Sequence, residues 1–411
     1  MKHNILSNRF YNDGSISEQL NDVQIKWLEL FKKESLEIEL SVCNCGSEDF
    51  EVIAQKDRYG IEMNTVICKK CGLVMTNPHM TQKSYDLFYD KFYNYIYRGE
   101  SCASEETWAE QKNRGKRIKT FIESCLGQEI SGKRILEIGC STGGILSEFD
   151  NNSVCGIDLS EEYVNFGRRK GLNLKCCTTR DLVLEKEKFD IIILSHVLEH
   201  FLDLDKEIDI IWRLLKDDGV VYIAVPGIKN VVSAYNNDFL LLLQNAHVYN
   251  FTRTTLHNVM SKNKFDMIYA TEEIQGLFKK GCELQFHNGY EEIVSFIKES
   301  EKLFAQPKEM LYSRLWKKIA DYKPGEIAIY GIGNETKKMI EAIPDLLSRI
   351  KCFVSYQEDA AQFEGKPIVD IEMLNGVKCI VIPSLIYRER IYFRIAELMM
   401  LRPSQPDLKL A

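Results

Sequence analysis

The sequence predicts an α/β protein organised around a parallel sheet. Between residues 131 and about 285, short apolar runs alternate with amphipathic helical patterns, which is typical of parallel strands joined by helices. The first apolar run, residues 134–138, leads into a glycine-rich turn at residues 139–144. A second alternation of the same kind begins at Pro324. The chain has 411 residues, more than one hydrophobic core usually serves, so we expect two or three domains.

Composition and charge narrow the class of protein. The formal net charge is −7, which argues against a nucleic-acid partner because phosphate binding needs clustered Lys and Arg side chains. The first residues lack the apolar run of a secretory signal, and no stretch approaches the roughly 18 apolar residues of a membrane span. The thirteen cysteines are scattered, so we expect reduced thiols or metal ligands. We therefore expect a cytoplasmic protein that binds neither nucleic acid nor membrane.

Five segments follow one another along the chain. Residues 1–40 change from polar to a helical pattern, and residues 41–82 form a β-like module rich in cysteine and glycine. Residues 83–130 are rich in tyrosine and in helix-forming residues, and suit a connector or lid. Residues 131–288 carry the main α/β alternation, and residues 289–411 hold one or two helices followed by the second α/β alternation.

The segment from Arg134 to Gly144, RILEIGCSTGG, predicts a strand, a tight turn and then a helix. Its glycines let the backbone approach a ligand closely. Glu137 stands just before the turn, where a carboxylate would repel phosphate but suits the ammonium group of an amino acid. The next strand ends in Asp158, and an acid at that place suits a ribose diol. A plain nucleotide-binding turn remains the alternative for the glycine stretch taken alone.

Three further strands follow in order: one before Cys177–Asp181, one beginning at Phe189, and one over residues 219–226. Together the strands carry the motifs LEIGCSTG, GIDLS and VLEH. These motifs resemble those of the class I methyltransferases, which use S-adenosylmethionine (SAM) and have a seven-stranded Rossmann-like sheet. The resemblance places the methionine moiety on the glycine turn and the sulfonium beside the fourth strand. The cofactor contacts that it implies are Glu137, Gly139, Cys140, Ser141, Gly143, Asp158, Leu159, Asp181, Ser195 and His196.

Two cysteine pairs flank a short β-like segment. They are Cys43-Asn-Cys45 and Cys68-Lys-Lys-Cys71, and each pair is followed by glycine. Paired thiolates on two such turns bind tetrahedral zinc, and we expect a structural zinc ion. The first pair is one residue shorter than the usual CxxC turn. Two alternatives therefore stay open: Cys43 is a bystander, or the module keeps the shape of a zinc ribbon without its metal.

The order of a cysteine ribbon, a class I core and a second Rossmann-like domain resembles the zinc-containing methyltransferases of deoxysugar pathways. Those enzymes act on nucleotide-diphosphate sugars. The segments that carry the resemblance are CGLVMTNP, LFYDKFYNYIYR, VLEH, QNAHVYNFT and IYGIGNET. The resemblance implies His247 as general base, His200 as a second catalytic residue, and substrate contacts from Tyr93, Tyr95, Tyr97, Asn245 and Tyr249. Each of these residues also has an ordinary interpretation as a packing or loop residue.

One departure from that family bears on the reaction. Its His-Glu-His run reads Asn245-Ala246-His247 here, so the second histidine is kept while the first histidine and the glutamate are absent. Methylation at carbon needs a C–H proton removed beside a keto group, and a positioned base with partners is expected for that step. Methylation at oxygen needs only a hydroxyl proton removed. Methylation at carbon and at oxygen or nitrogen therefore both stay open.

The carboxyl-terminal alternation contains Gly331-Ile-Gly-Asn-Glu-Thr336 after an apolar strand. Such a turn can cradle phosphate at the start of a helix, and the resemblance implies that Gly331, Gly333 and Asn334 help to hold the nucleotide-diphosphate part of the substrate. A packing domain without a ligand is the alternative. The last ten residues are expected to be loose.

Three functions are consistent with the sequence. The first is SAM-dependent methylation of a nucleotide-diphosphate sugar or related glycan precursor. The second is O-methylation of another small molecule. The third is a zinc-ribbon adaptor whose core binds SAM without turnover.

Overall fold

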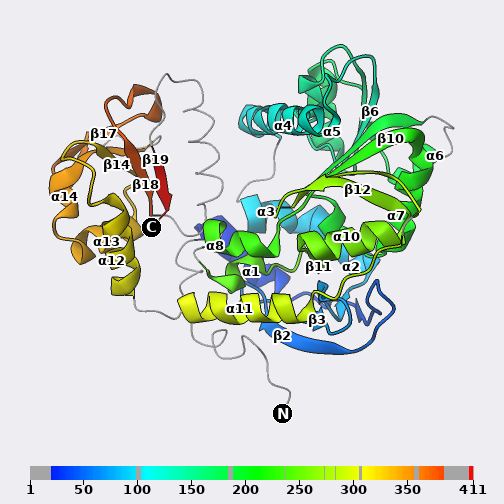
Figure 1. Cartoon of the computed structure of the whole chain (residues 1–411), viewed down its shortest axis with the longest axis horizontal. Helices are drawn as coiled ribbons and strands as arrows, with labels where there is room; N and C mark the ends of the chain where they lie inside the picture. Colours follow the sequence, from blue (N-terminus) through cyan, green and yellow to red (C-terminus); the bar gives the residue numbers. More distant parts are fainter. Residues whose placement is uncertain are drawn as a thin grey trace. The chain divides into compact units, whose positions relative to one another are not determined.

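The structure is a computed structural model, which describes residues 20–98, 103–183, 188–235, 237–272, 274–282, 284–304, 308–355, 361–383 and 407–410. The chain forms two compact units (Figure 1). Unit 1 comprises Met1–Lys229 and Leu242–Phe296, and unit 2 comprises Asn230–Leu241 and Ile297–Ala411. None of the described helices has the length and apolar content needed to cross a membrane.

Unit 1 begins with a small four-stranded antiparallel sheet that carries the cysteine pairs. The strand order is β11-β4-β3-β2, with β2 (Phe50–Lys56), β3 (Glu62–Cys68), β4 (Val74–Thr76) and β11 (Tyr249–Asn250). Two short strands flank the module along the chain, β1 (Ile38–Glu39) before it and β5 (His79–Met80) after β4. They pair with each other in antiparallel orientation. Strand β11 comes from a distant part of the chain, so this sheet brings the segment around His247 to the cysteine module.

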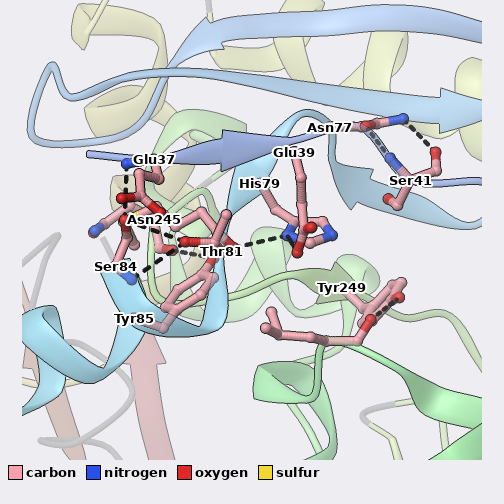
Figure 2. A network of polar contacts seen from close by, with 12 residues as sticks. Glu37, Glu39, Ser41, Asn77, His79, Thr81, Ser84, Tyr85, Asn245 and Tyr249 are labelled. Carbon is pink, nitrogen blue, oxygen red and sulfur yellow. Dashed lines mark hydrogen bonds and ion pairs between the residues drawn. The ribbon is translucent and has the colours of Figure 1, made fainter. Parts of the chain in front are cut away.

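Helices precede and follow the module, as the sequence predicts. They are α1 (Asp22–Phe31), α2 (Gln82–Lys91), α3 (Tyr93–Arg98) and α4 (Glu105–Leu126). Figure 2 shows the polar contacts that fix the start of α2: the Glu37 amide donates to the Ser84 hydroxyl at 2.8 Å, and the Tyr85 hydroxyl donates to the Asn245 carbonyl at 3.1 Å. These contacts join α2 to the segment that leads into β11.

The main sheet of unit 1 has seven strands in the order β12-β13-β10-β9-β6-β7-β8. They are β6 (Arg134–Ile138), β7 (Ser153–Asp158), β8 (Leu174–Cys176), β9 (Phe189–Ser195), β10 (Leu215–Ala224), β12 (Phe265–Ala270) and β13 (Gln275–Lys280). All pairings are parallel except those of β13, which runs antiparallel to both its neighbours. Residues 191–194 of β9 are all buried, as expected for a strand covered on both faces.

Helices pack around this sheet (Figure 1). They are α5 (Glu161–Arg169), α6 (Thr179–Val183), α7 (Leu204–Leu214) and α10 (Arg253–Lys262). One expectation was wrong: the glycine turn does not open a regular helix. Only a 3₁₀ turn, Leu146–Glu148, lies between β6 and β7. A Cβ at Gly144 would lie 2.7 Å from the carbonyl oxygen of Trp108 on α4, so α4 occupies the space beside the turn.

Unit 2 contains a six-stranded sheet in the order β16-β17-β15-β14-β18-β19. Its strands are β14 (Ile327–Tyr330), β15 (Ile350–Val354), β16 (Gln362–Phe363), β17 (Lys366–Val369), β18 (Cys379–Ile382) and β19 (Asp407–Leu410). The remaining helices of the chain are α8 (Val231–Ala234), α9 (Phe239–Leu242), α11 (Tyr290–Phe304), α12 (Lys308–Ile319), α13 (Asn334–Ala342) and α14 (Leu346–Arg349). The expectation of a loose tail was wrong for residues 407–410, because β19 pairs in parallel with β18.

Candidate active site

The glycine turn after β6 has the backbone of a close-approach loop. Gly139 and Gly143 have φ angles of 69° and 80°, and Ser141 between them has a φ of 49°. A Cβ at Gly139 would lie 2.5 Å from the Cγ2 atom of Val197. The glycine turn therefore packs directly against the VLEH segment, and two motifs far apart in sequence form one site.

Asp158 holds its carboxylate at this turn. Its Oδ2 atom accepts a hydrogen bond from the Ser141 amide at 2.7 Å, and its Oδ1 atom accepts one from the Ser160 amide at 2.8 Å. Of the other residues predicted to contact the cofactor, Leu159 is largely exposed. The Asp181 carboxylate accepts from the amide and hydroxyl of Thr178, both at 2.8 Å. Leu159 directly follows β7, whereas Asp181 lies in α6, beyond β8.

Glu137 is buried, with 1% of its surface exposed, and its Oε2 atom has no hydrogen-bond partner among the described residues. Burial raises the pKa of this carboxyl well above its usual range, against the opposing effect of Arg114. The Ser141 and Ser195 hydroxyls are also buried without a partner among the described residues. Unsatisfied buried polar atoms are costly, so this set fits a polar ligand with N–H donors, such as the amino-acid end of SAM.

A group of imidazole and carboxylate side chains joins the segment after β9 to the segment before β11. One ligand atom each of Glu199, His200 and His247 lies within 4.8 Å of the other two. Glu199 is 1% exposed, and neither of its carboxylate oxygens has a hydrogen-bond partner within the described structure. Its Oε1 atom is 3.9 Å from His200 Nε2 and 3.4 Å from His196 Nδ1. The cluster combines imidazole nitrogen atoms with a buried carboxyl group.

The surroundings of His200 fix its tautomer. Its Nδ1 atom lies 2.8 Å from the carbonyl oxygen of Ala246 and 2.9 Å from the hydroxyl of Tyr89, which itself donates to the same carbonyl at 3.3 Å. A carbonyl oxygen can only accept, so Nδ1 carries the proton. The Nε2 atom of His200 is therefore the basic nitrogen. Tyr89 was missed at the sequence level, although it lies in the tyrosine-rich stretch.

His247 is held in place by the cysteine module. The amide of Val248 donates to the Glu199 carbonyl at 2.8 Å, and the Thr76 amide on β4 donates to the Val248 carbonyl at 2.8 Å. The Thr76 hydroxyl also donates to the His247 carbonyl at 3.0 Å. Burial, together with the electrostatic effect of the neighbouring His200, Arg58 and His196 side chains, holds the pKa of His247 well below its usual value. The imidazole of His247 is therefore neutral and a weak base.

The predicted substrate-contacting tyrosines separate into two groups. Tyr93 and Tyr97 stack with ring centroids 5.2 Å apart, and the Tyr97 hydroxyl donates to Asn245 Oδ1 at 2.6 Å. Tyr95 faces elsewhere, because α3 is a helix, and its ring stacks on Trp27 at 4.3 Å. The Tyr249 hydroxyl donates to the Leu202 carbonyl at 3.2 Å, which gives it a packing role beside the cysteine module.

All four cysteines of the module converge. The sulfur atoms of Cys43 and Cys71 are 3.6 Å apart, and those of Cys45 and Cys68 are 3.5 Å apart. All four sulfurs lie within 4.8 Å of one another. Zinc–sulfur bonds of about 2.3 Å in a tetrahedron place the sulfurs about 3.8 Å apart, so this donor set fits one zinc ion. The shorter CxC half contributes both its thiols to the cluster.

The glycine turn of unit 2 follows β14. Gly331 has a φ angle of 92°, and its carbonyl accepts a hydrogen bond from the Thr336 hydroxyl at 2.9 Å. A Cβ at Gly331 or Gly333 would meet nothing within 4 Å. Helix α13 begins at Asn334, so the predicted strand, turn and helix are present in this unit.

Comparisons with known proteins agree with the arrangement of unit 1. Residues 110–270 match the family model described as "Methyltransferase domain". Ubiquinone biosynthesis O-methyltransferase of Bos taurus is 30% identical over 119 residues, which cover 26% of this chain and 32% of that protein. The enzyme of the same name from Pelagibacter ubique is 32% identical over 115 residues, which cover 26% of this chain and 48% of that protein. This chain spans about a third to a half of these relatives.

Two solved methyltransferase structures are similar to part of this chain at low sequence identity. The 1,6-didemethyltoxoflavin-N1-methyltransferase of Burkholderia thailandensis, with 1,6-didemethyltoxoflavin and S-adenosylhomocysteine bound, is 15% identical with a TM-score of 0.37. The alignment covers 53% of this chain and 96% of that one. An S-adenosylmethionine-dependent methyltransferase of Clostridium acetobutylicum is 16% identical with a TM-score of 0.33, covering 48% and 99% of the two chains.

The family match spans the glycine turn, the acid after β7 and the cluster after β9. It also spans most of the seven-stranded sheet. In that sheet the antiparallel strand β13 lies between β10 and β12. Residues 110–270 therefore form a methyltransferase domain with a Rossmann-like α/β fold.

Proposed function

We propose that the chain transfers the methyl group of SAM to an oxygen atom of a small organic acceptor. The observation that carries the proposal is the cluster of His200, Glu199 and His247. Glu199 and His200 belong to the VLEH segment, whose Val197 packs against the glycine turn. The matched relatives with the name ubiquinone biosynthesis O-methyltransferase support oxygen as the acceptor atom.

SAM supplies an electrophilic methyl group when it is bound. Its amino-acid end would be held by the Glu137 carboxyl and the glycine turn, and its ribose by Asp158. We assign the base to His200, whose Nδ1 atom faces the Ala246 carbonyl, which leaves Nε2 to accept a proton, and whose side chain is one-fifth exposed. Nε2 removes the acceptor's hydroxyl proton as the oxygen attacks, and the Glu199 carboxylate stabilises the imidazolium that forms. His247, which the sequence favoured as base, is the weaker base and acts as a neutral neighbour.

A nucleotide-diphosphate sugar is the second candidate acceptor. It is supported by the cysteine module, which holds the His247 segment through Thr76. We also propose that Cys43, Cys45, Cys68 and Cys71 bind a structural zinc ion.

The test is an assay for S-adenosylhomocysteine release from SAM. One panel holds CDP-, dTDP- and GDP-sugars, and the other holds hydroxylated aromatic compounds. We expect turnover with at least one acceptor. It should fall by about a hundredfold or more in His200→Ala and be kept in His287→Ala, whose imidazole is exposed and lies near the ring of His257. SAM binding without turnover on any acceptor would overturn the proposal and favour the adaptor.

A further inference from the structure

Arg58 lies in the turn between β2 and β3, against the segment that carries His247. Its amide donates to the Leu243 carbonyl at 3.0 Å, and its Nη2 atom donates to the Gln244 side-chain oxygen at 3.2 Å. The centre of its guanidinium group lies 4.9 Å from the ring centroid of Tyr59 and 5.3 Å from that of Tyr97. Two aromatic rings and a side-chain amide therefore hold a positive charge against the segment of residues 243–247, which we call the wall of the candidate acceptor site.

Asn245 provides a second donor at the same wall. Only 4% of its surface is exposed. Its Oδ1 atom accepts from the Tyr97 hydroxyl at 2.6 Å, while its Nδ2 atom is buried and has no hydrogen-bond partner within the described structure. A buried N–H donor without an acceptor is unfavourable. The side-chain amide of Asn245 can therefore donate a hydrogen bond to an oxygen atom of a ligand.

The neighbouring acid does not fill this role. Asp57 is buried, and its Oδ1 atom accepts from the amides of Tyr59 and Ile61 at 2.8 and 2.9 Å. Its Oδ2 atom accepts a hydrogen bond from the backbone amide of Asn245 at 3.2 Å. Asp57 thus shapes the turn and fixes the backbone of Asn245, and the oxygen that the Asn245 side chain needs comes from elsewhere.

The same wall is close to the reacting groups. Arg58 is one of the positive groups whose charge acts on His247. Asn245 is followed by Ala246, whose carbonyl oxygen orients His200. A ligand held by Arg58 and Asn245 is consequently positioned by the same short segment that positions the base.

We propose that Arg58 and Asn245 bind an oxyanion of the acceptor, a carboxylate or a phosphoryl group. Guanidinium groups form strong charge-assisted hydrogen bonds with both kinds of anion, and a planar fork orients them. The contact anchors the acceptor at its charged end and leaves its hydroxyl at the His200 side of the site. This inference rests on the proposed function and names the class of acceptor: a small molecule that carries an anionic group.

The experiment measures binding without turnover. The full chain, saturated with S-adenosylhomocysteine, is titrated calorimetrically with inorganic phosphate, pyrophosphate, benzoate and the neutral benzyl alcohol. We expect anions to bind, and Arg58→Gln to weaken that binding by about tenfold or more, as the loss of a charge-assisted contact implies. Arg58→Lys should give an intermediate loss, and Asn245→Ala a loss of several fold. The control is Arg213→Gln, which removes an exposed guanidinium paired with Asp209 on α7.

The four probes separate the two sources of the anion. Binding of phosphate or pyrophosphate alone supports a phosphoryl group, as in a nucleotide-diphosphate sugar, whereas binding of benzoate alone supports a carboxylate. Equal binding of benzyl alcohol and benzoate, equal binding by wild type and Arg58→Gln, or no anion binding at all would overturn the inference. S-adenosylhomocysteine affinity, measured first in every variant, shows whether the fold is intact. Because turnover is assayed separately, failure here leaves the proposed methyl transfer standing.

Discussion

The side-chain oxygen of Gln111, on α4, accepts a hydrogen bond from the hydroxyl of Thr142 in the glycine turn at 2.5 Å. The same Gln111 oxygen accepts a second hydrogen bond, from the Gly144 amide at 3.1 Å. One side chain of a preceding helix therefore holds two donors of the candidate cofactor loop. The glycine turn is not followed by a helix of its own, and α4 supplies the support that such a helix would give.

We expect Gln111→Ala to weaken S-adenosylhomocysteine binding by roughly tenfold, because removal of one acceptor leaves two buried donors unsatisfied at about 1 kcal/mol or more. Calorimetric titration measures the change. Gln82→Ala is the matched control, since Gln82 makes one exposed contact, to Asp86 on α2. Equal affinities in wild type and Gln111→Ala would show that the turn keeps its shape without this support.

The second prediction concerns Tyr89 and His200. Tyr89→Phe removes the hydroxyl that lies 2.9 Å from His200 Nδ1 but keeps the ring. The Ala246 carbonyl still accepts from Nδ1, so we expect kcat to fall by about tenfold, less than in His200→Ala, where a base worth about a hundredfold or more is lost. The affinity for S-adenosylhomocysteine should not change in either variant.

Steady-state kinetics with the best acceptor of the panel separates kcat from KM. Tyr95→Phe serves as the control, because Tyr95 lies in the next helix, α3, and its ring stacks on Trp27. A change of KM alone in Tyr89→Phe would assign that hydroxyl to acceptor binding, and the positioning role would then be wrong.

The order of strands and the turns of the methyltransferase core follow from the sequence, because apolar runs, glycines and terminal acids are local features. The contacts that complete the site are not local. Gln111 reaches the glycine turn from α4, and Tyr89 reaches His200 from α2. Arg58 meets Gln244 across 186 positions of the chain. Such pairings depend on packing between segments, which no periodicity or motif encodes.

The same limit explains the tyrosine predictions. Tyr93, Tyr95 and Tyr97 alternate in sequence, which suits either a strand or a helix. In α3 the first and third rings stack on each other, while the middle ring faces Trp27. The cysteine cluster was easier to predict, because each cysteine pair is followed by a glycine in the sequence. In the structure these glycines, Gly46 and Gly72, have φ angles of 80° and 83°.

The third prediction concerns the cysteine module. Cys68→Ser removes one of the four converging thiols, so we expect the purified protein to lose its zinc, which metal analysis measures. Because metal binding contributes to folding, the unfolding temperature should fall as well. Turnover should fall too, since β4 of this module holds the His247 segment through Thr76. Cys282→Ser, at an exposed thiol, is the control. Less than about a tenth of an equivalent of zinc in the wild type would contradict the bound-metal proposal.

The fourth prediction is a pH dependence of stability from His247. Burial holds the pKa of this imidazole well below its ordinary value of 6.5, so the folded protein binds fewer protons than the unfolded chain when the pH falls below about 6.5. The contribution is complete above that pH and is lost as the pH decreases, by up to about 1.4 kcal/mol per pH unit. Denaturant unfolding at several pH values between 7 and 5 should show a shallower slope in His247→Asn than in wild type, and His287→Asn should keep the wild-type slope. The comparison uses slopes because the smaller side chain also lowers stability at every pH. An unchanged slope in His247→Asn would mean that His247 is protonated in the folded protein, and its assignment as a neutral neighbour of His200 would have to be abandoned.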